Sequence, residues 1–183
     1  FPGLTLVGVD RDPIASAMAA QRLASFGERF VPRAGEHENL ASLLATINGG
    51  RINAILFDLG VSSMQLDEPQ RGFSYSRDAP LDMRMNPQDE LTAAQIVNTY
   101  TEGELVGVLR DYGEERSARR VAKAIIAARK VAPITSTAEL AELVRDAIPQ
   151  AAKRTGGHPA KRTFQALRIE INRELQGLPA ALD

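Results

Sequence analysis

The first sixty residues alternate between short apolar runs and amphipathic stretches. Runs rich in β-branched and apolar residues at 4–9 and 52–57 predict buried parallel strands, and a weaker run at 29–33 predicts a third. Periodic apolar positions predict helices over 13–26 and 39–47. This alternation is typical of an open, doubly wound α/β sheet. Because such sheets commonly contain a handful of strands, we expect further strands beyond these residues.

Helical periodicity replaces the strand signals from about residue 92 to residue 152. Two capping boxes, Thr101 with Glu104 and Ser136 with Glu139, predict helix starts. The expected division is the first part of an α/β core at 1–90, an all-helical insertion at 91–155 and a return to the core at 156–183, through a helix beginning near Ala160. Apolar residues at helical spacing in that helix predict core contacts: Phe164, Leu167, Ile171 and Leu175.

The composition is that of an ordinary globular protein, with 183 residues, 44% hydrophobic and 25% charged. The absence of cysteine excludes disulfides, thiolate metal sites and a cysteine nucleophile within these residues. With two histidines, a multi-histidine metal centre is not expected either. No apolar stretch is long enough for a membrane span, and nothing is typical of a signal peptide, so we expect a cytoplasmic protein without membrane contact.

The net charge of -1 conceals an uneven distribution along the chain. Residues 1–109 carry 8 basic and 14 acidic side chains, whereas residues 110–173 carry 14 basic and 7 acidic ones. Such a split predicts that one region contacts a polyanion. The alternative is a set of solvated helix faces.

One basic cluster has helical spacing. The segment 114–131 predicts a helix with a single basic face, formed by Arg116, Arg119, Arg120 and Lys123. Such a face suits a phosphate backbone, because each neutralised phosphate releases counterions. The alternative is local ion pairing with Glu114 and Glu115. A second cluster brackets a glycine-containing loop and consists of Lys153, Arg154, Lys161 and Arg162. His158 in that loop is interpreted as a hydrogen-bonding residue.

Acidic residues follow the predicted strands, where open α/β sheets bind their ligands. Asp12 precedes Pro13 and is explained as a helix N-cap. Asp10, at the strand tip, can accept hydrogen bonds from a ribose diol, or it is an exposed loop residue. Asp58 follows the run at 52–57 and precedes a loop of small polar residues, which suits either a polar ligand or an ordinary turn. The sequence has no G-x-G-x-x-G motif.

Four runs resemble a known enzyme family. The longest, at 55–86, reads ILFDLGVSSMQLDEPQRGFSYSRDAPLDMRMN, and the others are VGVDRDP at 7–13, YGEERSARRVAKAI at 112–125 and GGHPAKRTFQALRIEIN at 156–172. Together they resemble the RsmH (MraW) family of S-adenosylmethionine-dependent methyltransferases. Members of that family act on the N4 amine of a cytosine in bacterial small-subunit (16S) ribosomal RNA.

The resemblance implies a Rossmann-like class I methyltransferase core, incomplete in these residues, with an inserted all-helical domain for RNA recognition. It implies S-adenosylmethionine as cofactor and small-subunit ribosomal RNA, within the assembled subunit, as partner; a homodimer is left open. The family's first glycine loop and its later strands are expected to lie outside this sequence. The implied cofactor contacts are Asp10 on the ribose, His37 near the adenine, and Asp58 and Gln65.

Transfer to an exocyclic amine proceeds by direct displacement and needs positioning but no covalent enzyme intermediate, which a cysteine-free chain permits. Asp58 is the candidate catalytic residue, holding the amine or the donor. Phe73 and Tyr75 are candidates for stacking on the target base, and the alternative is that they anchor their loop. Asp82 and Arg84 are expected to order the mouth of the site.

Two other functions are considered. A Rossmann-type oxidoreductase would also use Asp10, and competition by NADH would reveal it. A non-catalytic RNA-binding module would use the basic helices alone.

Overall fold

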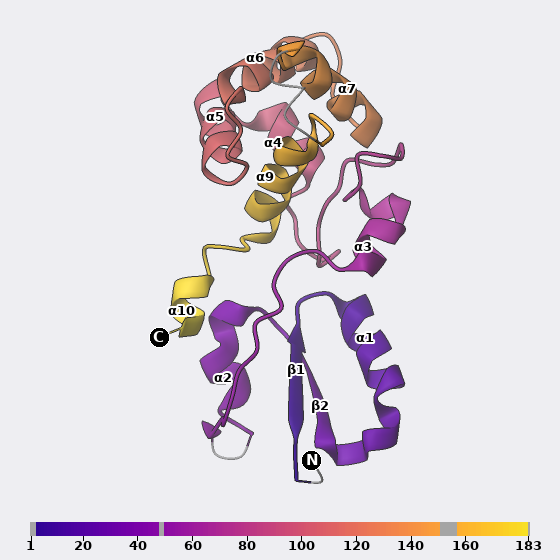
Figure 1. Ribbon diagram of the computed structural model, residues 1–183, viewed down its shortest axis with the longest axis vertical. Coiled ribbons are helices and arrows are strands. Elements are labelled where there is room, and N and C mark those ends of the chain that lie inside the picture. The colour runs from indigo at the N-terminus through magenta and orange to yellow at the C-terminus, as the bar shows by residue number, and fades with distance from the viewer. Residues whose placement is uncertain (1–2, 48–49, 151–156, 183) are drawn as a thin grey trace. The chain divides into compact units, whose positions relative to one another are not determined.

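The computed structural model describes residues 3–47, 50–150 and 157–182 (Figure 1). Its contacts divide the chain into two compact units, each formed from separate segments. We name them the sheet unit, which comprises Phe1–Leu59, Met85–Gln88 and Arg173–Asp183, and the helical unit, which comprises Gly60–Arg84 and Asp89–Asn172.

The sheet unit contains two parallel strands, β1 (Leu6–Asp10) and β2 (Phe30–Ala34), with Leu6 paired to Phe30 and Asp10 to Ala34. Parallel strands need a crossover, and α1 (Pro13–Arg22) with the 3-10 turn η1 (Ala24–Arg29) supplies it. The weaker run at 29–33 is therefore confirmed as a strand, shifted by one residue.

The helix predicted over 13–26 begins as expected and ends earlier. The side chain of Asp12 accepts a hydrogen bond from the Ile14 N–H at 3.0 Å, and proline follows in the first turn. The chain leaves the α-helix at Leu23 and bends at Gly27, whose φ of 54° and ψ of -133° are not helical.

The helix predicted over 39–47 is present as a short turn, η2 (His37–Asn39), and a short helix, α2 (Leu40–Leu44). The sheet unit also includes α10 (Leu178–Leu182), which packs on η2. These elements are too short to bury a broad apolar face.

The strand predicted at 52–57 was wrong for this structure. Within the described residues this segment has no ladder partner, and all its side chains except that of Phe57 are exposed, Ile55 by 54% and Leu56 by 90%. An apolar run predicts burial but does not supply the neighbouring strand that makes it part of a sheet.

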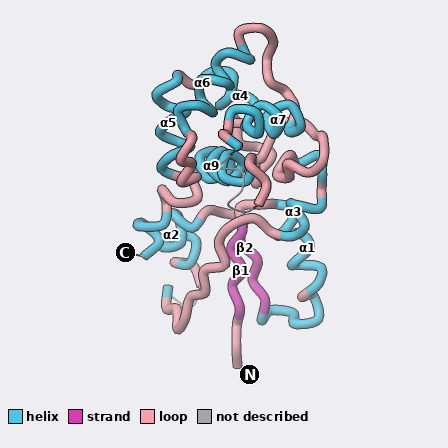
Figure 2. The backbone as a smooth tube through the Cα atoms, turned by 45° about the horizontal axis from the view of Figure 1, so that its top comes forward, coloured by secondary structure: helices cyan, strands magenta, loops and turns pink. Residues whose placement is uncertain are grey.

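The helical unit contains the hydrophobic core. Among the described residues, every buried apolar side chain except Met85 belongs to it. Its elements pack in adjacent pairs, α5 on α6 and α9, α6 on α7, and α4 on α6 and α9 (Figures 1 and 2). They are α3 (Ser63–Asp67), the 3-10 turn η4 (Pro69–Arg71), α4 (Ala93–Thr99), α5 (Glu102–Asp111), α6 (Ala118–Arg129), α7 (Thr137–Ala147) and α9 (Lys161–Asn172).

The contacts group a wider segment with the insertion than residues 91–155. The loop at 72–84 joins it because Thr137 Oγ1 accepts the Ala79 N–H at 3.0 Å and Asn172 Nδ2 donates to the Met83 carbonyl at 2.8 Å. Helix α9 joins it through α4 and α5. The boundaries at residues 90 and 155 stay a prediction of which residues form the insertion for RNA recognition.

Both predicted capping boxes are confirmed. Thr101 N–H donates to Glu104 at 2.7 Å and Ser136 N–H donates to Glu139 at 3.1 Å, with the reciprocal bonds present.

Leu175 was wrongly assigned to the core. Helix α9 ends at Asn172 and Arg173 has a φ of 50°, so Leu175 leaves the helical face and is 49% exposed.

Gly113 allows α9 to approach the end of α5 closely. A Cβ at this position would lie 2.6 Å from the Arg162 carbonyl oxygen and 2.8 Å from that of Leu109. We expect Gly113→Ala to destabilise the helical unit by about 1–3 kcal/mol, because backbone atoms on both sides would have to shift. Denaturant unfolding followed by circular dichroism measures this.

Gly107 provides the matched control within α5. A Cβ there would meet no atom within 4 Å, so Gly107→Ala should raise stability by about 0.5–1 kcal/mol through helix propensity. Equal effects of the two substitutions would contradict the close approach at Gly113.

Across the described residues, no helix is both long and apolar enough to cross a membrane.

Candidate functional site

Asp10 lies at the carboxyl end of β1, where the sheet unit exposes polar groups. Its Oδ1 accepts the Asp12 N–H at 2.8 Å, and its backbone carbonyl accepts the Gly35 N–H at 3.1 Å. Desolvation raises the pKa of Asp10, and the nearby charge of Asp12 also raises it, against hydrogen bonds that lower it. The carboxylate is thus oriented by backbone N–H groups at the strand end, where it can also accept a hydrogen bond from a ligand.

His37 reaches the same edge of the sheet, because η2 follows directly after β2. Next to it, Arg11 and Glu36 form an ion pair of 3.0 Å between the chain segments that leave the two strands. The Nε2 atom of His37 is buried, and a Cβ on Gly177 would lie 3.0 Å from it. The imidazole therefore packs against the segment before α10, and its contact with an adenine stays a prediction.

Asp58 and Gln65 have different surroundings. Asp58 is an exposed residue of the sheet unit, after the extended segment at 52–57. Gln65 is buried in the helical unit, where its Oε1 accepts the Ser62 N–H at 3.0 Å and its own N–H donates to Ser62 Oγ at 3.3 Å. This capping box of α3 explains the side-chain oxygen of Gln65, and its cofactor contact stays a prediction.

The two aromatic candidates lie in the loop at 72–84, named here the motif loop, and both are held by neighbouring side chains. Phe73 is 7% exposed, with the Arg71 guanidinium 5.7 Å from its ring centroid, which favours the loop-anchoring alternative. Tyr75 is half-buried and stacks on His158, with ring centroids 4.6 Å apart and planes at 14°. It also meets Phe164 edge-on at 5.6 Å. The cluster of Tyr75, His158 and Phe164 joins segments that lie far apart in the sequence. The aromatic character of these residues was the only signal in the sequence from which their contact could have been predicted.

Asp82 and Arg84 order the loop that carries them. The guanidinium makes two hydrogen bonds to the carboxylate, at 2.8 and 2.7 Å, and a third to the Asp89 carbonyl at 2.7 Å. Arg71 donates to the Arg84 carbonyl at 3.1 Å. Desolvation raises the pKa of Asp82, but the hydrogen bonds from Arg84 outweigh it and hold the pKa below its ordinary value. Their place at the mouth of a site stays a prediction.

We expect Asp82→Asn to destabilise the helical unit by about 1–2 kcal/mol at pH 7. Because the folded state lowers the pKa of Asp82, its contribution is complete above the unfolded value near 3.8 and disappears as the pH falls through the lower folded value. Chemical unfolding at pH 7 and pH 3 measures the difference. Asp111→Asn, in the exposed pair with Arg110, should leave the midpoint unchanged, and an equal effect there would contradict the assignment.

The predicted basic face is exposed. Arg119, Arg120 and Lys123 lie on α6, whereas Arg116 lies in the turn before it, because the helix begins only at Ala118. All four side chains are exposed, and none makes an ion pair within the described ranges.

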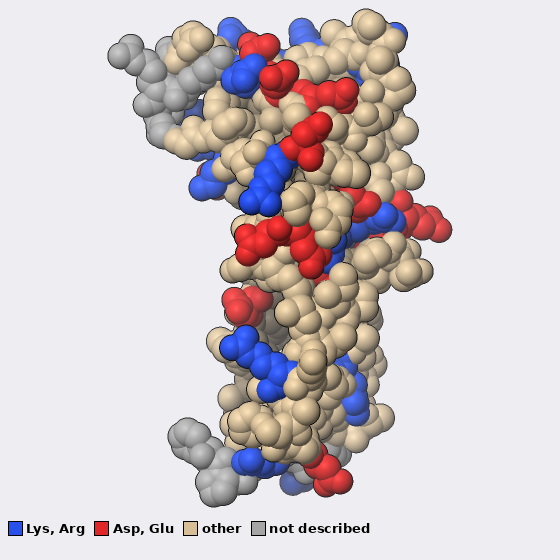
Figure 3. All heavy atoms as spheres, turned by 90° about the vertical axis from the view of Figure 1, so that its right-hand side faces the viewer, with Lys and Arg blue, Asp and Glu red and all other residues tan. Residues whose placement is uncertain are grey.

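The local-pairing alternative for this face is not observed. Glu115 is buried and accepts the Ser117 N–H at 2.7 Å, and the carbonyl of Glu114 accepts from Arg162 Nη1 at 2.8 Å. The four cations are therefore available to a ligand. On the face drawn in Figure 3, by contrast, acidic and basic side chains alternate.

Part of the second basic cluster lies at the start of α9. Lys161 and Arg162 are exposed there, and Arg162 also holds the turn after α5 through the Glu114 carbonyl. Lys153 and Arg154 lie outside the described residues.

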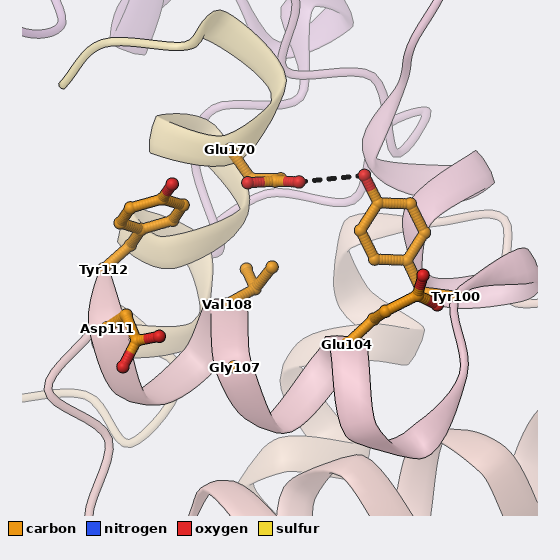
Figure 4. Close-up of a pocket in the computed structure, with 7 residues that line it drawn as sticks. All are labelled: Tyr100, Glu104, Gly107, Val108, Asp111, Tyr112 and Glu170. Carbon is orange, nitrogen blue, oxygen red and sulfur yellow. Dashed lines mark hydrogen bonds between the residues drawn. The ribbon is translucent and has the colours of Figure 1, made fainter. Parts of the chain in front are cut away.

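A cavity of about 310 Å³ in the helical unit was not predicted from the sequence (Figure 4). The Tyr100 hydroxyl donates to Glu170 at 2.9 Å across it, and the pKa of Tyr100 rises to about 12 because of desolvation and this bond. Since its ionisable lining is acidic and tyrosyl, the cavity would repel phosphate. It is lined by Tyr100, Glu104, Gly107, Val108, Asp111, Tyr112 and Glu170.

Comparison with known proteins gives the family. The pattern of the MraW methylase family matches residues 1–183. The chain belongs to the MraW methylase family. This match confirms the resemblance and the α/β methyltransferase class, to which the parallel pair β1–β2 and the flanking helices correspond.

Curated relatives of this MraW methylase chain carry the name ribosomal RNA small subunit methyltransferase H. Those of Mycolicibacterium smegmatis and Mycolicibacterium gilvum are 59% and 57% identical to it over 182 residues. The one of Streptomyces avermitilis is 52% identical over 182 residues. Each alignment covers all of this chain. It covers 49% of the length of each Mycolicibacterium relative and 57% of that of the Streptomyces relative, so the chain spans about half the length of these relatives.

Proposed function

We propose that the protein transfers a methyl group from S-adenosylmethionine to the exocyclic N4 amine of a cytidine in small-subunit ribosomal RNA, within the assembled subunit. The observation that carries this proposal is the match of the whole chain to the MraW methylase family and to relatives named for small-subunit ribosomal RNA methylation. This substrate would place the protein in the cytoplasm.

The sheet unit has residues that suit the cofactor. The carboxylate of Asp10 can accept from a ribose hydroxyl at the carboxyl end of β1, where α/β sheets hold nucleotides. His37 lies beyond the next strand end, within the same unit, and would contact the adenine. The bound cofactor would supply a methyl group activated by its sulfonium.

Asp58 is the residue that we assign to the amine. Its carboxylate is exposed and makes no hydrogen bond or ion pair within the described residues, so both oxygens can accept the amine hydrogens. Holding the amine in line with the methyl group supplies orientation without a covalent intermediate.

The exposed cations of the helical unit would bind the RNA backbone. Four basic side chains on and before α6 make no ion pair within the described residues, and two further exposed cations begin α9, so these groups can neutralise neighbouring phosphates. These residues are Arg116, Arg119, Arg120, Lys123, Lys161 and Arg162.

Transfer of tritiated methyl from S-adenosylmethionine to small subunits lacking the modification tests the proposal. The purified protein should label the ribosomal RNA, and digestion to nucleosides should place the label on N4-methylcytidine. Binding of RNA without any transfer would instead indicate a non-catalytic module. Displacement of S-adenosylmethionine by NADH would indicate an oxidoreductase site.

A further inference from the structure

Three aromatic rings form a column in the helical unit. Phe164 of α9 is 4% exposed and meets the ring of Tyr75 edge-on at 5.6 Å, with planes at 84°. The other contact of Tyr75 is the parallel ring of His158 at 4.6 Å. Because Phe164 is buried, Tyr75 half-buried and His158 exposed, the column leads from the core to the surface and ends on an imidazole.

The imidazole at the end of the column is fixed in orientation. His158 Nδ1 accepts the Ala160 N–H at 3.2 Å, and the His158 carbonyl accepts the Lys161 N–H at 3.0 Å. Since Nδ1 is an acceptor, the neutral ring carries its hydrogen on Nε2. A ring held by a hydrogen bond and a stacking partner has already lost its rotamer freedom, which lowers the entropic cost of placing a ligand on it.

Two basic residues follow this ring closely in the chain. Lys161 and Arg162 begin α9 directly after the loop, and both are exposed. Lys161 makes no ion pair within the described part of the chain, so its ammonium group is available to a phosphate. An exposed aromatic face beside free positive charge is the combination by which proteins hold single-stranded nucleic acid.

We propose that the exposed face of His158 stacks on an unpaired base of the RNA, with Lys161 contacting a neighbouring phosphate. This inference rests on the proposed function and names the part of the surface that takes an unpaired nucleotide. Tyr75 then acts as the support that orients His158, and the imidazole is the stacking surface.

Two substitutions of His158 separate its ring from its hydrogen bond. His158→Asn keeps an acceptor for the Ala160 N–H and removes the ring, whereas His158→Phe keeps the ring and removes the acceptor. The probe is a single-stranded RNA dodecamer carrying 2-aminopurine, whose fluorescence falls when the base stacks. Affinity and quenching are measured from 50 to 300 mM salt on the purified protein.

We expect His158→Asn to weaken RNA binding about 5- to 100-fold and to abolish the quenching, while His158→Phe retains both. The salt dependence of binding should stay unchanged in both variants, because stacking releases no counterions. Lys161→Ala should lower the salt slope by about one and leave the quenching in place. Thermal melting by circular dichroism confirms that each variant is folded.

Wild-type affinity and quenching in His158→Asn would overturn the proposal. So would a loss in His158→Phe equal to that in His158→Asn, since the hydrogen bond and not the ring would then be the cause. The stacking proposal and the proposed methyltransferase function can be disproved independently of each other. Methylation that survives with wild-type RNA affinity in His158→Asn leaves the enzyme assignment intact, whereas ring-dependent RNA binding without any methyl transfer leaves only the stacking site.

Discussion

Replacement of Asp58 by alanine is expected to lower methyl transfer by about 100- to 10,000-fold, with little change in the thermal midpoint. The loss follows from removal of the acceptor that we assign to the amine during transfer, for which effects of this size are typical. The thermal midpoint should change little because the Asp58 side chain is exposed and makes no hydrogen bond within the described residues. The measurement is kcat and KM for tritium transfer to unmodified small subunits, beside a melting curve.

Asp146→Asn is the matched control for that experiment. Asp146 is an exposed carboxylate on α7 whose partner is Arg145, at 3.4 Å, and it has no place in the proposed site. It should retain wild-type kcat. Undiminished transfer by Asp58→Ala would remove Asp58 from the reaction while leaving the family assignment unaffected.

The second large effect concerns charge on α6. We expect the double reversal Arg119→Glu and Arg120→Glu to weaken binding of ribosomal RNA by about 50-fold or more near 0.1 M salt. The slope of log affinity against log salt should fall by about two, because two phosphate contacts would no longer release counterions. Filter binding over a salt series measures both quantities.

Reversal of Arg110 and Arg145 gives the same change of net charge elsewhere in the helical unit. Each of these arginines is exposed and already paired with an acid, Arg110 with Asp111 and Arg145 with Asp146. Their reversal should reduce affinity far less and leave the slope near the wild-type value. Equal losses in the two double variants would show that net charge acts at long range and that α6 has no special contact.

The sequence predicted those parts of the fold that depend on local chemistry. The N-cap at Asp12 and the capping boxes at Thr101 and Ser136 formed as predicted, because each satisfies backbone groups within one turn. The box of Ser62 with Gln65 has the same pattern and could have been found by the same rule. Instead Gln65 was assigned only to a ligand.

Features that depend on distant partners were not predictable in the same way. The apolar run at 52–57 lacks a neighbouring strand among the described residues, and periodicity cannot report that. Leu175 keeps its helical spacing but falls beyond the turn at Arg173, where the backbone leaves the helix.

The candidate site shows the same distinction. Asp10 and His37 could be placed at one sheet edge from strand order alone, because parallel strands end on the same side. The stack of Tyr75 on His158 joins the motif loop to the start of α9 and follows from tertiary packing. Sequence reasoning therefore named both residues without pairing them.

The uneven distribution of the core has a thermodynamic consequence for ligand binding. Among the described residues, almost all buried apolar side chains belong to the helical unit, so within this chain β1 and β2 have little packing that resists local opening. A ligand that binds the strands only when they are paired stabilises the paired state against local opening by mass action. The stabilisation is about 2.7 kcal/mol when the free ligand concentration is one hundred times the dissociation constant. Occupancy near Asp10 and His37 would then help to order the segment that forms the site.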